Sequence, residues 1–261
     1  MALVEVRPPG AADPGAASGA PADDEAVVVR FRSDVVVELV RAAAADADVA
    51  SAARVSTVGE RSREVPDAAA LAGLITFLMR ERHGTPFEHS TFTFYVKAPI
   101  FVWREHMRHR IASYNEESAR YRVLEPEFYL PGADRDLVQV GKAGAYTYQP
   151  GTPAQQALVA EGFRSVCTHA YGQYQRMLAG GVAREIARGV LPVTIYSRAY
   201  VTMNARALMN FLSLRRRDDR SHFPSYPQRE IELVAEAYET HFAQHMPLTH
   251  AAFLACGRVC P

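Results

Sequence analysis

Residues 108–121 read RHRIASYNEESARY, a short stretch that gathers charged and polar side chains. The segment 104–122 holds five arginines and three glutamates, whereas the whole chain balances 29 Lys and Arg against 29 Asp and Glu. Arginine presents a planar set of N–H donors that matches phosphate oxygens, and each charge-assisted contact contributes roughly 1.5–3 kcal/mol where water is displaced. The stretch therefore predicts a site for anions, such as a nucleotide phosphate together with a second phosphorylated ligand.

Two other interpretations of this cluster stay open. A solvated helix face would hold Arg104 and Arg108, which are four residues apart and point the same way on a helix, but the run 114–118 has poor helix propensity. RNA binding by the same arginines is the second alternative. A formal net charge of zero makes it weaker than binding of a small nucleotide.

Several familiar sites are absent from the sequence. It contains no GxGxxG after a strand, P-loop, HExxH, GxSxG or CxxC, which argues against a Rossmann dehydrogenase or a P-loop kinase. The three cysteines are an odd number, which is typical of a reducing cytoplasm, and CGRVC at 256–260 lacks the second pair that a zinc site needs. There is no run of 18 apolar residues and no apolar signal-peptide core. We therefore expect a cytoplasmic protein with no metal site and no membrane segment.

The elements that would position the cluster follow from the hydrophobic pattern. Residues 1–26 have few large apolar side chains and predict a disordered tail, and residues 27–261 predict one catalytic domain. Strands are expected at 27–32, at 34–40 and from Phe92 to Pro99, and helices at 41–54 and at 71–82, the latter ending near Gly84. Pro99 opens a helix whose apolar face carries Ile100, Trp103 and Met107, and a loop follows around 113–115.

The second half of the chain is expected to be mostly helical. Residues 125–153 are predicted to form loops. Helices are predicted at 154–179, 182–190, 204–214 and 228–245. A strand is predicted at 193–202, and the charged segment 215–227 is a predicted loop. Strands early and helices late indicate an α+β fold.

Four motifs in order then resemble the flavin-dependent thymidylate synthases. The arginine cluster matches the RHR-x7-S signature of that family, with Ser118 as its last residue. The other three are HGTPFEH at 83–89 with the segment from Phe92 to Arg104, AREIARGVLP at 183–192, and NARALMNFLSLR at 204–215. The similarity covers most of residues 34–215. It implies a single mixed α/β domain in which long helices pack on the sheet, and a homotetramer with active sites at subunit interfaces.

The resemblance also implies an activity and its ligands. The expected reaction is reductive methylation of dUMP to dTMP, with methylenetetrahydrofolate as carbon donor and FAD, reduced by NADPH, as hydride carrier. The residues implied for FAD are His83, Thr85, Glu88, Arg108, His109, Arg110, Glu116, Asn204, Arg206 and Asn210. Those implied for the nucleotide are Glu105, Arg108, Glu116, Glu117, Ser118, Ala119, Arg120, Arg188 and Arg215. Arg215 is also the implied catalytic residue, facing the pyrimidine and favouring ionisation at N3.

The chemistry of the residues agrees with that picture. Methylation at C5 of uracil requires electron density at that carbon, which a Cys thiolate can create by adding at C6. Cys167 falls on a predicted buried helix, and Cys256 and Cys260 lie outside the motifs, so none is well placed. A guanidinium beside the ring stabilises the enolate-like form without a protein nucleophile. Ser118 has no evident base nearby, which favours a ligand-binding role.

Alternatives remain for the substrate and for single residues. A relative that methylates UMP or another pyrimidine nucleotide would carry the same motifs. His83 could simply end its helix, Asn204 could be a helix N-cap, and Arg188 and Arg206 could be surface charges. Two features depart from the family: Glu105 stands where Gln is expected, and the loop at 216–227 is longer than expected.

Overall fold

The centre of the protein is a four-stranded antiparallel sheet in the order β2-β3-β8-β4. The computed structural model describes residues 28–142 and 145–261, so the tail predicted at 1–26 lies outside the described residues. The strands of the sheet are β2 (Val36–Ala43), β3 (Thr91–Pro99), β4 (Ser113–Glu116) and β8 (Tyr196–Asn204). In β3 the apolar side chains at alternate positions, Phe92, Phe94 and Val96, are fully buried. This alternation is what fixes one face of the sheet toward the core.

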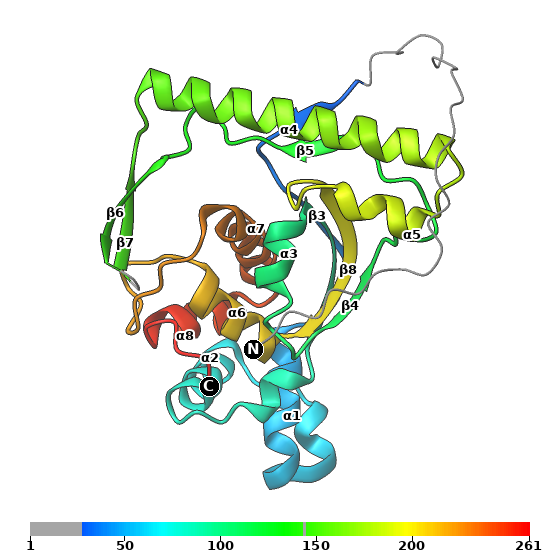
Figure 1. Ribbon diagram of the computed structural model, residues 1–261. Coiled ribbons are helices and arrows are strands. Elements are labelled where there is room, and N and C mark those ends of the chain that lie inside the picture. Colours follow the sequence, from blue (N-terminus) through cyan, green and yellow to red (C-terminus); the bar gives the residue numbers. More distant parts are fainter. Residues whose placement is uncertain (1–27, 143–144) are drawn as a thin grey trace, which may run out of the picture.

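Three helices lie against that face, on the same side of the strands in Figure 1. They are α3 (Ile100–His106), α6 (Ala205–Arg215) and α7 (Arg229–His245). The ring of Tyr238 on α7 packs 4.2 Å from that of Phe94 and 5.5 Å from that of Phe211 on α6. These aromatic contacts join the two helices to the central strand.

A second group of helices gathers beside the first turn of α6. It comprises α1 (Asp46–Val58), η1 (Gly59–Arg63), α2 (Ala68–Arg80), η2 (Thr85–Glu88) and α8 (Pro247–Ala255), which lie together in the lower part of Figure 1. The helix α2 contacts both α1 and α8, and η2 contacts α1 and α6. The helix α6 therefore adjoins this group through η2.

A smaller core lies under the long helix α4 (Pro153–Ala179). Cys167, Tyr171 and Tyr174 of α4 are buried there with Phe128. The remaining elements are the parallel pair β1 (Arg30–Arg32) and β5 (Glu127–Tyr129), the hairpin of β6 (Val138–Lys142) and β7 (Ala145–Gln149), α5 (Arg184–Ala187) and η3 (Arg188–Val190). Figure 1 shows the hairpin descending from one end of α4, away from α5.

The mixed α/β architecture is confirmed, as are most predicted helices and the strand that ends at Pro99. Three local predictions were wrong. Residues 41–43 extend β2, and the helix begins only at Asp46, where the Asp48 carboxylate accepts from the Ala45 amide at 2.9 Å. The expected loop around 113–115 is strand β4, because it pairs with the edge of β8. The expected loops of 125–153 contain β5, β6 and β7.

Two details of helix ends also differ. The helix α2 ends at Arg80, and the left-handed residue after it is Arg82 with φ 61, not Gly84, whose φ is −76. Met107 is an exposed C-cap, whereas His106 takes the buried place beside Trp103. Helix α8 was not predicted. No helix among residues 28–142 and 145–261 is long and apolar enough to cross a membrane.

Asp46 connects the two ends of the helical group. Its carboxylate is 8% exposed and accepts hydrogen bonds from the backbone N–H groups of Leu248 and Thr249, each at 2.9 Å, and from the Thr249 hydroxyl at 2.6 Å. These two amides belong to the first turn of α8, where no intrahelical acceptor exists. A residue at the start of α1 thus caps α8.

We expect Asp46→Ala to lower the free energy of unfolding by roughly 2–4 kcal/mol, because three donors lose a charged acceptor in a buried place. Asp48→Ala is the matched change, since Asp48 accepts one exposed capping bond from the Ala45 amide; it should cost about 1 kcal/mol or less. Urea denaturation of both variants measures the difference. Equal losses would contradict the cross-helix cap.

Candidate active site

Arg215, the last residue of α6, lies between two side chains from the end of α3. Its Nη1 forms an ion pair with Glu105, and its Nε donates to Nε2 of His109 at 3.0 Å. The side chains of Arg215 and Glu105 are only 20% and 25% exposed. Because two of its nitrogens are held, the guanidinium has a fixed orientation, and within the described part of the chain Nη2 has no partner. That nitrogen can donate to a ligand.

His109 is held in its neutral form at this position. Burial lowers the pKa of the imidazole to about 4, and the neighbouring charge of Arg215 acts in the same direction. The ring packs at 4.6 Å from that of Phe211. A neutral ring with Nε2 as acceptor is the state that can receive the Arg215 N–H. His109 therefore orients the guanidinium without adding charge.

His106 lies behind the contact between His109 and Arg215. The sequence did not predict it as a positioning residue. Its ring is fully buried, with Nδ1 3.2 Å from the Tyr114 hydroxyl and Nε2 3.0 Å from that of Tyr238. The Tyr114 hydroxyl donates to the backbone carbonyl of His109 at 2.8 Å. Burial lowers the pKa of His106 to about 3, with a smaller contribution from His109. The only signal in the sequence was its place three residues after Trp103 on the apolar helix face.

Three arginines next to Glu105 and His109 in the chain have no side-chain acceptor among the described residues. Arg104 on α3 and Arg108 and Arg110 after it are exposed, and none forms an ion pair with any residue of 28–142 or 145–261. Other exposed arginines, such as Arg41 and Arg61, also lack a carboxylate partner among the described residues, so these three are marked by their place next to Glu105 and His109 in the chain. They are suited to bind an anion.

A second group of predicted residues lines a cavity of about 530 Å³ between α1, the end of α2, η2 and the start of α6. His83, Thr85 and Arg206 are among the lining residues. Arg206 pairs with Glu88 at 2.5 Å and donates to the Pro261 carbonyl at 2.8 Å.

Backbone features hold Arg206 at this cavity. A Cβ on Gly84 would clash with its guanidinium and lie 2.8 Å from the backbone oxygen of Pro261, so this close approach favours glycine. Asn204 is the N-cap of α6 and accepts from the Ala207 amide at 2.8 Å, as one alternative expected. Asn210 is exposed one turn beyond Arg206 on the same side of α6.

The third group follows β4 at the other end of the sheet. Glu116 accepts from the Ser197 hydroxyl at 2.5 Å, and Glu117 pairs with Arg198 at 3.3 Å. In the turn that follows, Ala119 is buried.

The same turn is tied to α5. The Ser118 hydroxyl accepts from the Arg120 amide at 3.3 Å, and the Arg120 guanidinium pairs with Glu185 of α5 at 2.9 Å. Arg188, at the start of η3, is exposed and has no ion-pair partner among the residues that the structure describes. Arg120 and Arg188 thus border the same short helix.

The three groups are distinct within one chain. Arg206 and Arg215 lie nine residues apart on α6, which corresponds to about 14 Å. Glu116 pairs opposite Ala199, five residues before Asn204 on β8, or about 17 Å along the strand. No hydrogen bond or ion pair between described residues joins the groups. The predicted convergence of Arg108, Arg188 and Arg215 is therefore not formed by contacts inside one chain.

The cysteines lie away from Arg215. Cys167 is buried in the smaller core, its sulfur 3.4 Å from the Thr194 hydroxyl. Cys260 was expected to lie outside the motifs, but its thiol donates to the backbone carbonyl of Arg206 at 3.2 Å. Burial raises the pKa of both thiols, so neither is a thiolate at neutral pH. Among the described residues, no group of three or more His, Cys, Asp or Glu side chains is arranged to hold a metal ion.

Comparison with known proteins gives three kinds of similarity. The family model described as thymidylate synthase complementing protein matches residues 38–248. The flavin-dependent thymidylate synthase of Streptomyces coelicolor is 56% identical over 244 residues, covering 92% of this chain and 98% of that protein. That of Tropheryma whipplei is 55% identical over 239 residues, covering 88% of this chain and 97% of the relative.

Solved structures are similar over nearly the same length. The UMP/dUMP methylase PolB from Streptomyces cacaoi bound with 5-Br dUMP has 52% sequence identity and a TM-score of 0.85, covering 89% of this chain and 100% of that one. The same methylase bound with 5-Br UMP gives a TM-score of 0.84 at 52% identity, covering 89% and 99%.

The buried histidine generates a prediction about stability at low pH. The pKa of His106 is about 3 in the fold against 6.5 in an unfolded chain, so the unfolded state binds the extra proton between these values. The stability it contributes is fully present above about pH 6.5 and is lost as the pH falls toward 3. We expect the wild type to lose stability more steeply than His106→Gln between about pH 6 and pH 4.5, by up to about 1.4 kcal/mol per pH unit.

Urea denaturation at a series of pH values measures these slopes. His169→Gln, on an exposed side of α4, is the control and should keep the wild-type slope. Parallel slopes for the wild type and His106→Gln would show that His106 is not held neutral.

Proposed function

Because this chain belongs to the flavin-dependent thymidylate synthases, a family of methyltransferases, we propose that it converts dUMP to dTMP by reductive methylation at C5. The carbon donor in this proposal is methylenetetrahydrofolate, and FAD reduced by NADPH is the hydride carrier. The observation that carries the proposal is the oriented guanidinium of Arg215, held by Glu105 and neutral His109 while no thiolate lies beside it. The reaction then depends on charge at the pyrimidine and not on a sulfur nucleophile.

Arg215 activates the ring in this mechanism. Its free Nη2 donates to the carbonyl beside N3 of the uracil, which stabilises negative charge on the ring and raises electron density at C5. Neutral His109 keeps the guanidinium in place, and the network of His106, Tyr114 and Tyr238 keeps His109 in place. An activating donor that is already oriented needs no rearrangement when the charge develops.

The remaining nucleotide contacts come from the groups around the sheet. Arg108 and Arg188 are unpaired cations suited to phosphate, and the turn 116–120 offers the Ser118 hydroxyl and the Arg120 guanidinium. Glu105 and Glu117 complete the proposed nucleotide set, with the backbone of Ala119. Since these groups are separate within one chain, we propose a homotetramer in which a second copy completes each site.

The residues at the second cavity fit the flavin by their chemistry. A space of about 530 Å³ lined by Thr85, His83 and Arg206 offers a hydroxyl, an imidazole and a guanidinium to an anionic cofactor. Glu88, Asn204 and Asn210 lie on the adjoining elements, and Arg108, His109, Arg110 and Glu116 would come from the other groups. When bound, the flavin supplies the hydride that reduces the transferred carbon to a methyl group.

A second candidate substrate is UMP. The support is the similarity to PolB, a UMP/dUMP methylase described with both 5-Br UMP and 5-Br dUMP. The two substrates differ only in the 2′-hydroxyl of the ribose. The proposed chemistry at Arg215 is the same for both.

The purified full chain should be yellow and should oxidise its reduced flavin when dUMP and methylenetetrahydrofolate are added together. Turnover of dUMP and UMP at equal concentrations then separates the two substrates by their kcat/KM values. A colourless protein that does not bind added FAD, and whose affinity for RNA falls steeply with salt, would contradict the synthase and support an RNA-binding protein.

Glu105 gives a sharper test of the role of Arg215. Replacing its carboxylate in Glu105→Gln removes the charge that neutralises the guanidinium, so the ring anion should be stabilised further. We expect the pH dependence of kcat for dUMP to move to lower pH by about one unit, while Arg215→Lys should lower kcat roughly a hundredfold because the planar contact is lost. Glu161→Gln on the exposed side of α4 is the control. A profile in Glu105→Gln identical to the wild type would contradict this role of Arg215.

A further inference from the structure

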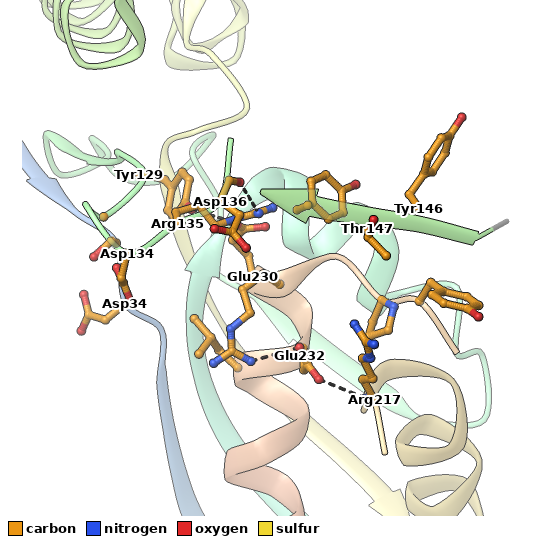
Figure 2. A pocket seen from close by; sticks show the side chains of 17 residues that line it. Asp34, Tyr129, Asp134, Arg135, Asp136, Tyr146, Thr147, Arg217, Glu230 and Glu232 are labelled. Atoms are coloured by element: carbon orange, nitrogen blue, oxygen red, sulfur yellow. Dashed lines mark hydrogen bonds and ion pairs between the residues drawn. The ribbon is translucent and has the colours of Figure 1, made fainter. Parts of the chain in front are cut away.

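A larger cavity of about 630 Å³ lies away from the residues assigned to FAD and the nucleotide. It is bounded by the β6–β7 hairpin, the segment 33–34, the loop that follows α6 and the first turn of α7. Figure 2 shows Glu230 at the start of α7 in this space, with Thr147 and Tyr146 on the hairpin strand. The sequence motifs assign no role to the charged segment 216–227 or to the β6–β7 hairpin.

Glu230 is the unusual residue of this cavity. Its side chain is 3% exposed, and its Oε1 accepts from the Tyr129 hydroxyl at 2.6 Å and from Arg135 Nε at 2.7 Å. Its Oε2 is buried and has no hydrogen-bond partner. Burial raises the pKa of this carboxyl, but the bonds from Arg135 and Tyr129 outweigh it and hold the pKa below its usual value. A charged, half-satisfied carboxylate therefore lines the cavity, which calls for a donor.

The other charges around the cavity are mostly negative. The carboxylates of Asp134 and Asp136 line it and accept from no residue of 28–142 or 145–261. Asp34 is paired with Arg32, and Glu232 accepts from the side chains of Arg216 and Arg229 and from the backbone of Arg217.

Most basic residues that line the cavity already pair with carboxylates. Arg135 donates to Glu230 and lies 5.2 Å from the centre of the Tyr148 ring, and Arg229 pairs with Glu232 and Glu236. Arg217 is the lining cation whose guanidinium has no acceptor among the described residues. Five acidic lining residues against three basic ones leave a negative excess.

The excess of negative charge in the cavity does not indicate a metal site. Within residues 28–142 and 145–261 no three acidic, histidine or cysteine side chains come close enough together to hold one. The cavity instead offers widely spaced carboxylates and the rings of Tyr146, Tyr148 and Tyr226. Aromatic faces and separated acceptors are the features that attract an organic cation.

We propose that this cavity binds a small organic cation, whose ammonium or guanidinium group donates to Oε2 of Glu230 and whose carbon chain lies against the tyrosines. The site selects against phosphates and carboxylates, because the carboxylates of Asp134 and Asp136 repel them and outnumber Arg217, the lining cation without an acceptor among the described residues. It is therefore distinct from the proposed sites for the nucleotide and the flavin cofactor, because both of those ligands are anions. The volume accommodates a chain of several carbons with a charged group at each end.

Isothermal titration of the purified, flavin-loaded full chain tests the proposal with two probes. Agmatine carries a guanidinium and an ammonium group, and spermidine carries ammonium groups only, so their relative affinities identify the preferred head group. 1,5-Pentanediol and glutarate are the neutral and anionic controls of similar length. We expect saturable binding of at least one cation below about 1 mM and none of the controls.

Matched variants assign the binding to the cavity. Glu230→Gln should weaken it at least tenfold, Asp136→Asn should weaken it at least threefold, and Glu161→Gln, on an exposed side of α4, should leave it unchanged. If Glu230→Gln does not fold, Asp136→Asn decides, since Asp136 has no partner among the described residues to lose.

Three results would overturn the proposal. The first is the absence of saturable binding of either cation, as expected if a single water satisfies Glu230. The second is unchanged affinity in both Glu230→Gln and Asp136→Asn. The third combines two observations: the wild type binds neither cation, and light scattering shows a lower molar mass for these variants than for the wild type. The cavity would then hold a basic side chain of another copy.

Discussion

The contact between Arg215 and the end of α3 is the constraint on which the site depends. A guanidinium is useful for activating a pyrimidine only if its direction is fixed, and Glu105 on α3 and His109 in the segment after α3 fix it here. That contact requires α3 and α6 to meet at their C-terminal ends. The ring of His106 on α3 packs 4.7 Å from that of Phe211 on α6, and Tyr238 packs against both rings and against Phe94 of the central sheet. The core and the proposed catalytic group are thus one assembly.

Electrostatic balance in this region comes from neutral histidines and not from more ion pairs. His106 and His109 lie close to a guanidinium, and burial lowers the pKa of each. A charged imidazole at either place would repel Arg215 and weaken the packing on Phe211. The hydroxyls of Tyr114 and Tyr238 satisfy His106 without introducing charge. The positive charge of the site therefore resides on arginines, where an anionic ligand can use it.

The sequence predicted the elements whose pattern is local. The alternation of Phe92, Phe94 and Val96 predicted β3, and the motif around Asn204 predicted the start of α6 and its cap. The pattern around 113–115 predicted a loop where the strand β4 lies, because an edge strand of four residues is defined by its partner and not by its own propensity. The contacts of His106 and Cys260 were missed for the same reason, since they join segments more than 50 residues apart. Ordered motifs predicted the residues of the proposed site, but not that one chain keeps them in three groups.

Strand β8 has a consequence for how such proteins can diverge. It carries Ser197 and Arg198, which hold the turn after β4, and it ends at Asn204, which starts the helix of Arg206 and Arg215. All nine of its residues pair with β3, so one inserted residue would turn every following side chain to the opposite face. We therefore expect changes in length to be tolerated outside this strand, such as in the hairpin and the loop after α6. The number of residues in β8 sets the spacing between the groups.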